Sequence, residues 1–168
     1  MSWCRYVLLA GLLASGCGYQ PLYGVQGAAG TGPQAQLETV RIEPIADRTG
    51  QQIYNFLRDG LNPLGRPASA QYLLSVVLHE NEDTLFIRED QTASRANLTL
   101  RARFALRRAD TGEAVLQGET RSTSSFDILT DPFATIVSEE DARRRSAREL
   151  SDEIRTRLAI YFAKAGIS

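Results

Sequence analysis

One stretch of the sequence decides the fold of this chain: residues 96–108 read ANLTLRARFALRR. From Ala96 to Leu106 every second residue is alanine, leucine or phenylalanine, and most residues between them are polar or charged. Side chains of a strand point alternately to its two faces, so this pattern predicts a strand with one apolar and one wet face. Such strands are typical of antiparallel sheets that have one face on the core and one face in water.

The residues after this strand predict its partner. Asp110-Thr111-Gly112 is typical of a three-residue hairpin loop in which the glycine takes the left-handed conformation. The resulting register places Arg103 opposite Glu119, and a shift by one residue would separate these opposite charges. We therefore expect the next strand to run over residues 114–126.

Two more strands and a helix are expected upstream. Apolar residues alternate with charged ones over residues 37–45, and residues 71–79 form a strand that a polar run, residues 80–83, is expected to break before it resumes. Between these two strands, the segment Thr49–Gln52 fits a capping box that starts a helix. Asn62-Pro63 ends this helix, because proline disfavours a helical residue before it.

A long amphipathic helix is expected at the C-terminal end. Ser138 is a favourable N-cap, and the three acidic residues after it would lie at the positive end of the helix dipole. Apolar residues recur at helical spacing up to a predicted end near Ala165: Ala147, Leu150, Ile154, Leu158, Tyr161 and Phe162. The order β-α-β-β-β-α predicts one α+β domain over residues 37–168, with two helices on one face of a four-stranded, mainly antiparallel sheet.

The N-terminal segment predicts a lipid anchor. Residues 7–14 form an apolar run, preceded by a positive charge, that is too short to span ~30 Å of hydrocarbon as a helix. Small residues then lead to Cys17, as in bacterial lipoproteins. We expect residues 1–16 to be a signal peptide, Cys17 to carry S-diacylglycerol and N-acyl chains, and residues 17–36 to form a flexible tether. The alternative is an ordinary signal peptide, with Cys17 as a spare thiol.

The composition excludes several classes of function. The chain has 168 residues, a formal net charge of -1 and 43% hydrophobic residues, which suits one folded domain. The near-zero charge argues against a nucleic-acid binder. One histidine and two cysteines offer no metal-ligand cluster, and the sequence has no nucleophile or phosphate-loop motif, so we expect no enzyme activity, cofactor or metal. His79, beside the polar run, is expected to be an ordinary solvated residue.

Arginines form two candidate surfaces for anionic groups. Three of them occupy the wet face of the strand over residues 96–108: Arg101, Arg103 and Arg107. Arg121 lies on the neighbouring strand, and guanidinium groups bind phosphate and carboxylate well. The alternative is an ordinary wet face on which Glu119 screens Arg103. A second group is expected to be a solvated helix face paired with nearby acids: Arg143, Arg144, Arg145 and Arg148.

Similarity to a known family covers nearly the whole chain. It is most specific around the predicted anchor, where residues 16–24 read GCGYQPLYG. It continues in Tyr72-Leu73-Leu74, in residues 141–145 (DARRR) and in residues 157–162 (RLAIYF). With these motifs the chain resembles the lipopolysaccharide-assembly lipoproteins called LptE, of the alphaproteobacterial type.

The resemblance implies a function as well as a fold. The family is a lipoprotein that plugs and helps to assemble the outer-membrane β-barrel LptD, and the pair inserts lipopolysaccharide into the outer leaflet. By resemblance, this chain is anchored through Cys17 in the outer membrane, faces the periplasm, and has an LptD-type barrel and lipopolysaccharide as partners. Basic residues are thought to bind lipopolysaccharide, and strand parity makes Arg101, Arg103 and Arg107 the candidates. The alternative is a lipid-anchored auxiliary subunit of another envelope transport or secretion complex.

Overall fold

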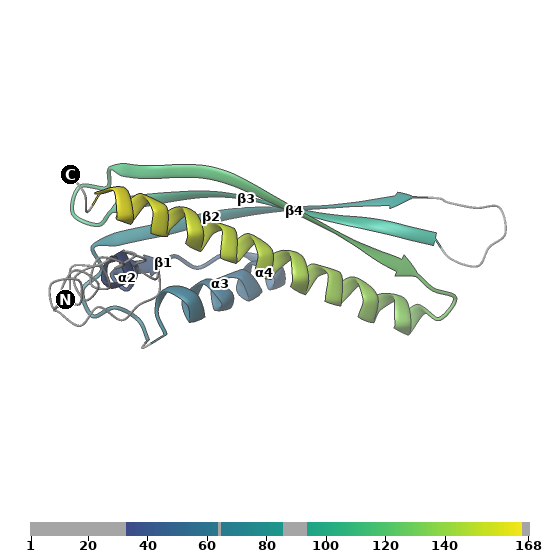
Figure 1. Cartoon of the computed structure of the whole chain (residues 1–168). Helices are drawn as coiled ribbons and strands as arrows, with labels where there is room; N and C mark the ends of the chain where they lie inside the picture. The colour runs from purple at the N-terminus through teal and green to yellow at the C-terminus, as the bar shows by residue number, and fades with distance from the viewer. Residues whose placement is uncertain (1–32, 64, 86–93, 166–168) are drawn as a thin grey trace, which may run out of the picture.

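Four strands and three helices make up the computed structural model, which describes residues 33–63, 65–85 and 94–165. In chain order they are α2 (Pro33–Leu37), β1 (Val40–Ile42), α3 (Asp47–Leu61), β2 (Tyr72–Leu85), β3 (Ser94–Arg108), β4 (Ala114–Ile128) and α4 (Pro132–Ala165). The strands form one sheet in the order β1-β2-β3-β4, with β1 parallel to β2 and the other neighbours antiparallel. Figure 1 shows α3 and α4 on one face of this sheet. The predicted α+β architecture is confirmed, with α2 as an additional short helix.

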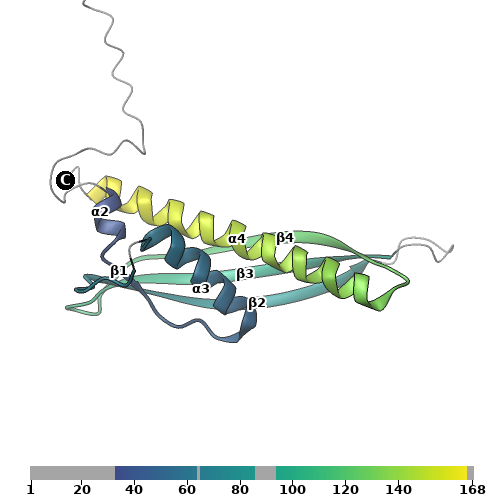
Figure 2. The ribbon, with the colours of Figure 1, turned by 90° about the horizontal axis from the view of Figure 1, so that it is seen from below.

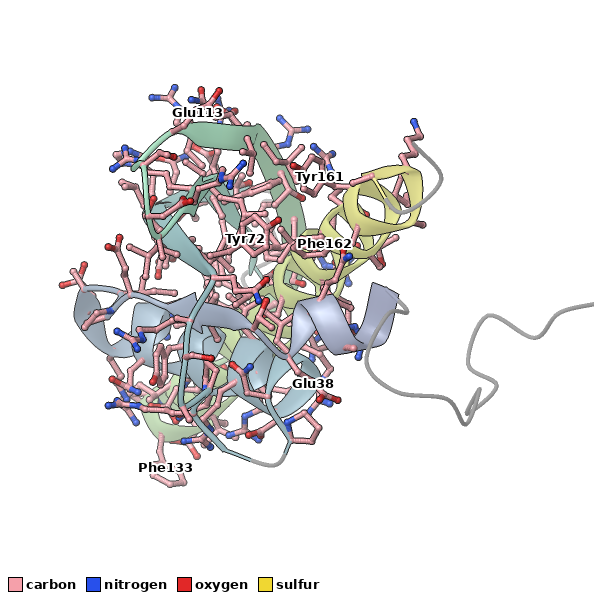
Figure 3. The ribbon with its side chains drawn as sticks, turned by 90° about the vertical axis from the view of Figure 1, so that its left-hand side faces the viewer. Glu38, Tyr72, Glu113, Phe133, Tyr161 and Phe162 are labelled. Carbon is pink, nitrogen blue, oxygen red and sulfur yellow. The ribbon has the colours of Figure 1, made fainter. Side chains whose placement is uncertain are left out.

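The core lies between the sheet and the two long helices, and it follows the predicted alternation. On β3 the inward side chains are all buried: Ala96, Leu98, Leu100, Ala102, Phe104 and Leu106. Buried residues of α3 and α4, such as Ile53, Leu57 and Ile154, belong to the same cluster. Near one end of the sheet, Phe162 of α4 meets Tyr72 of β2 edge-on, with ring centroids 5.1 Å apart (Figure 3). Burial of such side chains, at about 1.5–3 kcal/mol each, is the main source of stability.

β3 and β4 form the hairpin that the sequence predicts. Gly112 has a φ of 71°, in the left-handed region where residues with a Cβ are strained. Arg103 lies directly opposite Glu119, as the loop length predicts. β4 continues to Ile128, slightly beyond the predicted end at Phe126. The turn therefore sets the register that brings the charged side chains of the two strands together.

The first strand and the first helix differ from the prediction at their ends. β1 is shorter than expected, because Leu37 already belongs to α2. The expected capping box is wrong: α3 begins at Asp47, and the Thr49 hydroxyl instead donates to a carboxylate oxygen of Glu80 at 3.1 Å. Glu80 is part of β2, which continues through residues 80–83 instead of breaking, because β3 pairs with it along its whole length.

α4 begins at Pro132 rather than after the predicted N-cap Ser138. The Asp131 carboxylate accepts a hydrogen bond from the backbone N–H of Phe133 at 2.9 Å, as an N-cap does. Proline is favoured at the first helical position because its missing N–H would have no helical partner there. The Asp-Pro pair that ends the strand segment therefore also starts the helix.

The domain is elongated along its strands (Figure 1, Figure 2). α2, the β3–β4 turn and the C-terminal end of α4 lie at one end, and the first turns of α4 lie at the other. Four large apolar side chains are exposed near the start of α4: Leu129, Phe133, Ile136 and Val137. Across the described ranges, no helix has the length and apolarity that a membrane crossing requires.

Part of the sequence prediction lies outside the described residues. This applies to the signal peptide over residues 1–16, to Cys17, and to the tether as far as residue 32. Residues 33–36, which the sequence assigns to the tether, lie in α2. Leu37 at the end of α2 is buried in the core, so the packed domain starts with this short helix.

Candidate functional site

Four of the exposed arginines on the sheet face opposite α3 and α4 are Arg101, Arg103, Arg107 and Arg121. Arg95 lies further along the same face of β3 and pairs with Asp127 of β4 at 3.2 Å. We call the first four side chains the cationic face. They stand at odd-numbered positions of β3 and β4, whose even-numbered neighbours along most of these strands are buried or half-buried. The structure thus brings the three predicted candidates together on one surface and places Arg121, which the sequence assigns to the neighbouring strand, directly opposite Arg101.

Three basic side chains form a row across this face. Arg101 of β3 lies opposite His79 of β2 on one side and opposite Arg121 of β4 on the other. Arg101 and Arg121 are directly opposed like charges, which destabilise a sheet, so the stability of strand pairing does not explain their placement. The row instead creates a positive local potential, which attracts anionic groups.

Glu119 is the carboxylate that compensates part of the cationic face. Its Oε2 accepts a hydrogen bond from Arg103 Nε at 2.8 Å, and its Oε1 lies 3.3 Å from Arg101 Nη1. The hydrogen bond from Arg103 lowers the pKa of the Glu119 carboxyl, and the positive charge of Arg101 lowers it further. Glu119 is therefore ionised at neutral pH and offsets one of the four arginine charges. The predicted pairing with Arg103 is confirmed, and the contact with Arg101 adds to it.

Two arginines of the cationic face have no such partner. Among the described residues, no carboxylate oxygen lies within 4.0 Å of Arg107 or Arg121. Arg103 and Arg107 also line a shallow depression of about 520 Å³, together with Val77, whose side chain is 57% exposed. A guanidinium rim beside exposed apolar surface suits an anion that also has an apolar part.

The arginines of α4 are in different surroundings. Arg143 and Arg145 pair with acids on the same helix, and Arg143 Nη2 also lies 2.9 Å from a carboxylate oxygen of Glu80. The guanidinium of Arg148 lies over the ring of Phe56, 4.7 Å from its centroid. The predicted pairing of this helix face with nearby acids is confirmed for Arg143 and Arg145, so less free charge is available here.

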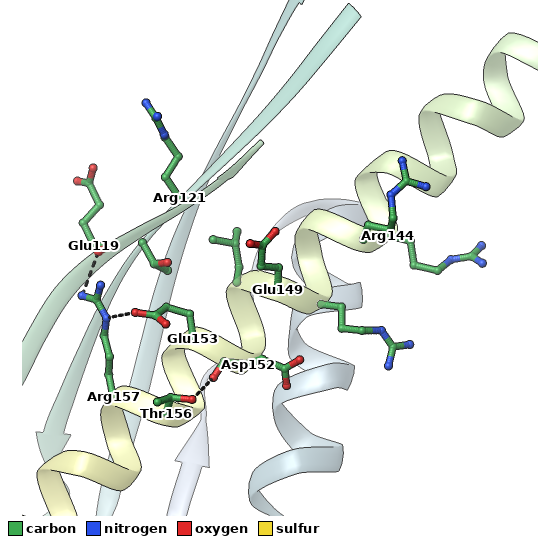
Figure 4. A pocket seen from close by; sticks show the side chains of 12 residues that line it. Glu119, Arg121, Arg144, Glu149, Asp152, Glu153, Thr156 and Arg157 are labelled. Atoms are coloured by element: carbon green, nitrogen blue, oxygen red, sulfur yellow. Dashed lines mark hydrogen bonds and ion pairs between the residues drawn. The ribbon is translucent and has the colours of Figure 1, made fainter. Parts of the chain in front are cut away.

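A groove of about 750 Å³ lies between β4 and α4 (Figure 4). Figure 4 shows Glu119 and Arg121 pointing away from α4, toward the open face. Arg157 bridges the two elements: its Nη1 donates to the backbone carbonyl of Glu119 at 3.1 Å, and its Nε donates to Glu153 at 2.7 Å. The edge of the sheet and the arginines of α4 therefore form the walls of one groove.

His79 is exposed, as expected for a solvated residue. It does not lie beside a break, however, but within a continuous β2 and opposite Arg101. Parity along the strand is the signal for its face, but its partner depends on the register of β2 against β3. Across the described ranges, no three His, Cys, Asp or Glu side chains converge as metal ligands would.

Comparison with known proteins relates this chain to one family. The family model LptE, described as lipopolysaccharide-assembly, matches residues 37–158. An uncharacterised protein of Rickettsia prowazekii (strain Madrid E) is 23% identical over 159 residues, which cover 95% of this chain and 97% of that protein.

Solved structures of lipoproteins share the fold. The crystal structure of a candidate lipoprotein from Caulobacter crescentus CB15 matches with a TM-score of 0.64 and 24% identity, covering 79% of this chain and 96% of that one. The solution structure of an uncharacterised lipoprotein B from Nitrosomonas europaea matches with a TM-score of 0.55 and 18% identity, covering 76% and 85%. At these identities the likeness concerns the fold alone.

The fold and the site define a class of small α+β domain, with one sheet face covered by helices and the other open and cationic. The chain belongs to the LptE lipopolysaccharide-assembly family, since the family model matches most of its length. This is a family of non-enzymatic lipoproteins. Membership in this family supports a role as a lipopolysaccharide-assembly lipoprotein.

Proposed function

We propose that this protein is an outer-membrane lipoprotein that plugs an LptD-type barrel, helps it to assemble, and assists the insertion of lipopolysaccharide into the outer leaflet. Family membership supports the assembly role. The observation that carries the finer proposal is the cationic face, where only two of the four guanidinium groups have a carboxylate partner among the described residues. Lipopolysaccharide carries phosphates on lipid A, and guanidinium groups bind phosphate in a bidentate manner.

The proposed mechanism has three parts. Acyl chains on Cys17 hold the domain at the outer membrane, facing the periplasm, because two or more chains anchor stably. The domain fills a barrel lumen, and the polar interior of such barrels suits an open sheet face with charged side chains. Arginines of the cationic face compete with divalent cations for lipid A phosphates, which keeps the glycolipid from aggregating.

The cationic face is tested by charge reversal. We expect the double variant Arg101→Glu with Arg103→Glu to bind purified lipopolysaccharide at least about tenfold more weakly, because each charged hydrogen bond contributes roughly 1.5–3 kcal/mol. Titration with labelled lipopolysaccharide measures this affinity. The double variant Arg58→Glu with Arg66→Glu, at exposed arginines of α3 and of the segment after it, is the matched control for net charge. Equal affinity of the double variant and the control would exclude this surface.

The partner and the anchor are tested separately. Affinity purification from detergent-solubilised outer membranes should recover a large outer-membrane barrel. Recovery of inner-membrane transporter subunits instead would favour the auxiliary-subunit alternative.

The lipid anchor is tested by labelling. Cys17→Ala should abolish labelling with radioactive palmitate, and labelling at the level of the unmodified protein would refute the lipid anchor.

A further inference from the structure

The outer edge of β4 is open along the sheet. β4 stands at the end of the strand order and pairs with β3 on one side only. A free strand edge presents backbone N–H and C=O groups on which another extended chain can pair. β4 spans Ala114–Ile128, so the open edge is long enough for several such pairs.

Hydrogen bonds from two arginines of α4 show which backbone groups of β4 point to its open edge. Arg157 Nη1 donates to the carbonyl of Glu119 at 3.1 Å, and Arg145 Nη2 donates to the carbonyl of Ser125 at 3.4 Å. The backbone N–H and C=O groups of an antiparallel strand point to its two edges in alternation from residue to residue. The backbone groups of the two odd-numbered residues between Glu119 and Ser125 therefore also point to the open edge: Arg121 and Thr123. In the described chain, no backbone group pairs with these two residues on that side. They form a window bracketed by the two arginines.

Positive charge lies on both sides of this window. Arg121 projects to the open face, and Arg144 of α4 lines the groove on the other side (Figure 4). Among the described residues, neither guanidinium has a carboxylate oxygen within 4.0 Å. The carboxylates of α4 that also line the groove have partners of their own: Glu153 pairs with Arg157, Asp152 with Arg155, and Glu149 accepts a hydrogen bond from the Ser122 hydroxyl. A chain that paired with β4 would therefore meet one arginine without a carboxylate partner on each of its two faces.

We propose that the window of β4 between Glu119 and Ser125 is a docking site for a short, extended, acidic segment of a protein partner, which adds a strand to the sheet. Arg121 and Thr123 would pair with the backbone of the segment, as in other cases of strand addition. Successive side chains of the added strand would point to opposite faces, so its acidic residues would lie near Arg121 on one face and near Arg144 in the groove on the other. A second copy of this chain fits poorly, because pairing through the same window would bring like charges together. Arg121 belongs both to the cationic face and to this window, but backbone pairing along the edge of β4 does not require lipopolysaccharide.

The edge is tested with a defined peptide and a pair of variants of the full chain in detergent. The probe is the fluorescein-labelled peptide Thr-Glu-Glu-Val-Glu-Glu-Thr, with the corresponding lysine peptide as its control. Thr123→Pro removes an outward N–H that β3 does not use, and edge strands tolerate proline there. Thr123→Ala is the matched control, because it removes the same side chain and keeps the N–H. Arg144→Glu tests the charge in the groove.

We expect the protein to bind the glutamate peptide and not the lysine peptide. Thr123→Pro and Arg144→Glu should each weaken this binding at least about tenfold, and Thr123→Ala should weaken it less than about twofold. Saturating peptide should also slow amide exchange at Arg121 and Thr123 in the unmodified protein, a readout that needs no variant to fold. Equal binding by the two Thr123 variants, or unchanged exchange at these amides, would overturn the site. Equal binding of the lysine peptide would overturn the acidic protein partner.

Discussion

At the scale of single residues, Glu119 limits the positive charge of the cationic face. It contacts Arg101 and Arg103, and replacing it with glutamine removes the negative charge while a hydrogen-bonding side chain remains. We therefore expect Glu119→Gln to bind lipopolysaccharide more tightly, by roughly threefold to tenfold. Titration with labelled lipopolysaccharide measures this change, with Glu113→Gln, an exposed acid near the β3–β4 turn, as control. Weaker binding by Glu119→Gln would show that its carboxylate orients the arginines more than it neutralises them.

The lowered pKa of Glu119 gives a second prediction at this scale. Since the pKa in the folded protein lies below the unfolded value, the carboxylate contributes stability above its ordinary pKa, and this contribution is lost as the pH falls through the folded pKa. The largest cause is the hydrogen bond from Arg103, so Arg103→Gln should raise the pKa of Glu119 toward its ordinary value. A titration of the Glu119 carboxyl carbon by NMR measures the shift. Identical titrations in both proteins would exclude this hydrogen bond as the cause.

The sequence predicts the contacts of this face only where a local turn fixes them. Arg103 and Glu119 are predicted as partners because three loop residues set the register of the hairpin. The row through His79 is not predictable in this way, because no comparable turn motif between residues 85 and 94 fixes β2 against β3. Long-range pairing sets that register, and a single sequence contains little information about it.

At the scale of elements, Asp131 sets the start of α4. Its carboxylate accepts a hydrogen bond from the Phe133 N–H, so Asp131→Ala should lower the free energy of unfolding by about 1 kcal/mol. Urea unfolding followed by circular dichroism measures this loss. Asp131→Asn keeps a capping oxygen and should lose much less. Equal losses in the two variants would mean that the charge of Asp131, and not its cap, stabilises the helix.

Element interiors are predicted better than element ends. The stripe that contains Leu150 and Ile154 and the alternation of β3 are both borne out, because burial requires the same period along the whole element. Ends depend on single residues that have competing signals. Ser138 is a favourable cap in sequence, but Asp131-Pro132 supplies an earlier start, and no glycine or proline interrupts the chain between Pro132 and Ser138.

At the scale of the whole molecule, the two ends of the domain differ in their surfaces. The segment that carries Cys17 joins the domain at α2, which lies at the same end as the C-terminal turns of α4 (Figure 2). The other end exposes Phe133, with 73% of its surface accessible, beside three further apolar side chains. Clustered apolar surface of this kind marks contact sites in soluble domains. The Phe133 end is therefore the end of the domain furthest from α2, where the proposed tether joins it.

This difference between the two ends predicts that the Phe133 end contacts the barrel most closely in the proposed complex. A photo-crosslinking phenylalanine analogue at Phe133 should capture the outer-membrane barrel in cells, whereas the same analogue at Lys164, near the α2 end, should capture it far less. Both side chains are exposed, so neither replacement disturbs the core, and urea unfolding should show less than about 0.5 kcal/mol of change. Capture of the barrel from Lys164 but not from Phe133 would contradict this orientation. Capture from neither position, with intact lipidation at Cys17, would contradict the proposal that the domain plugs the barrel.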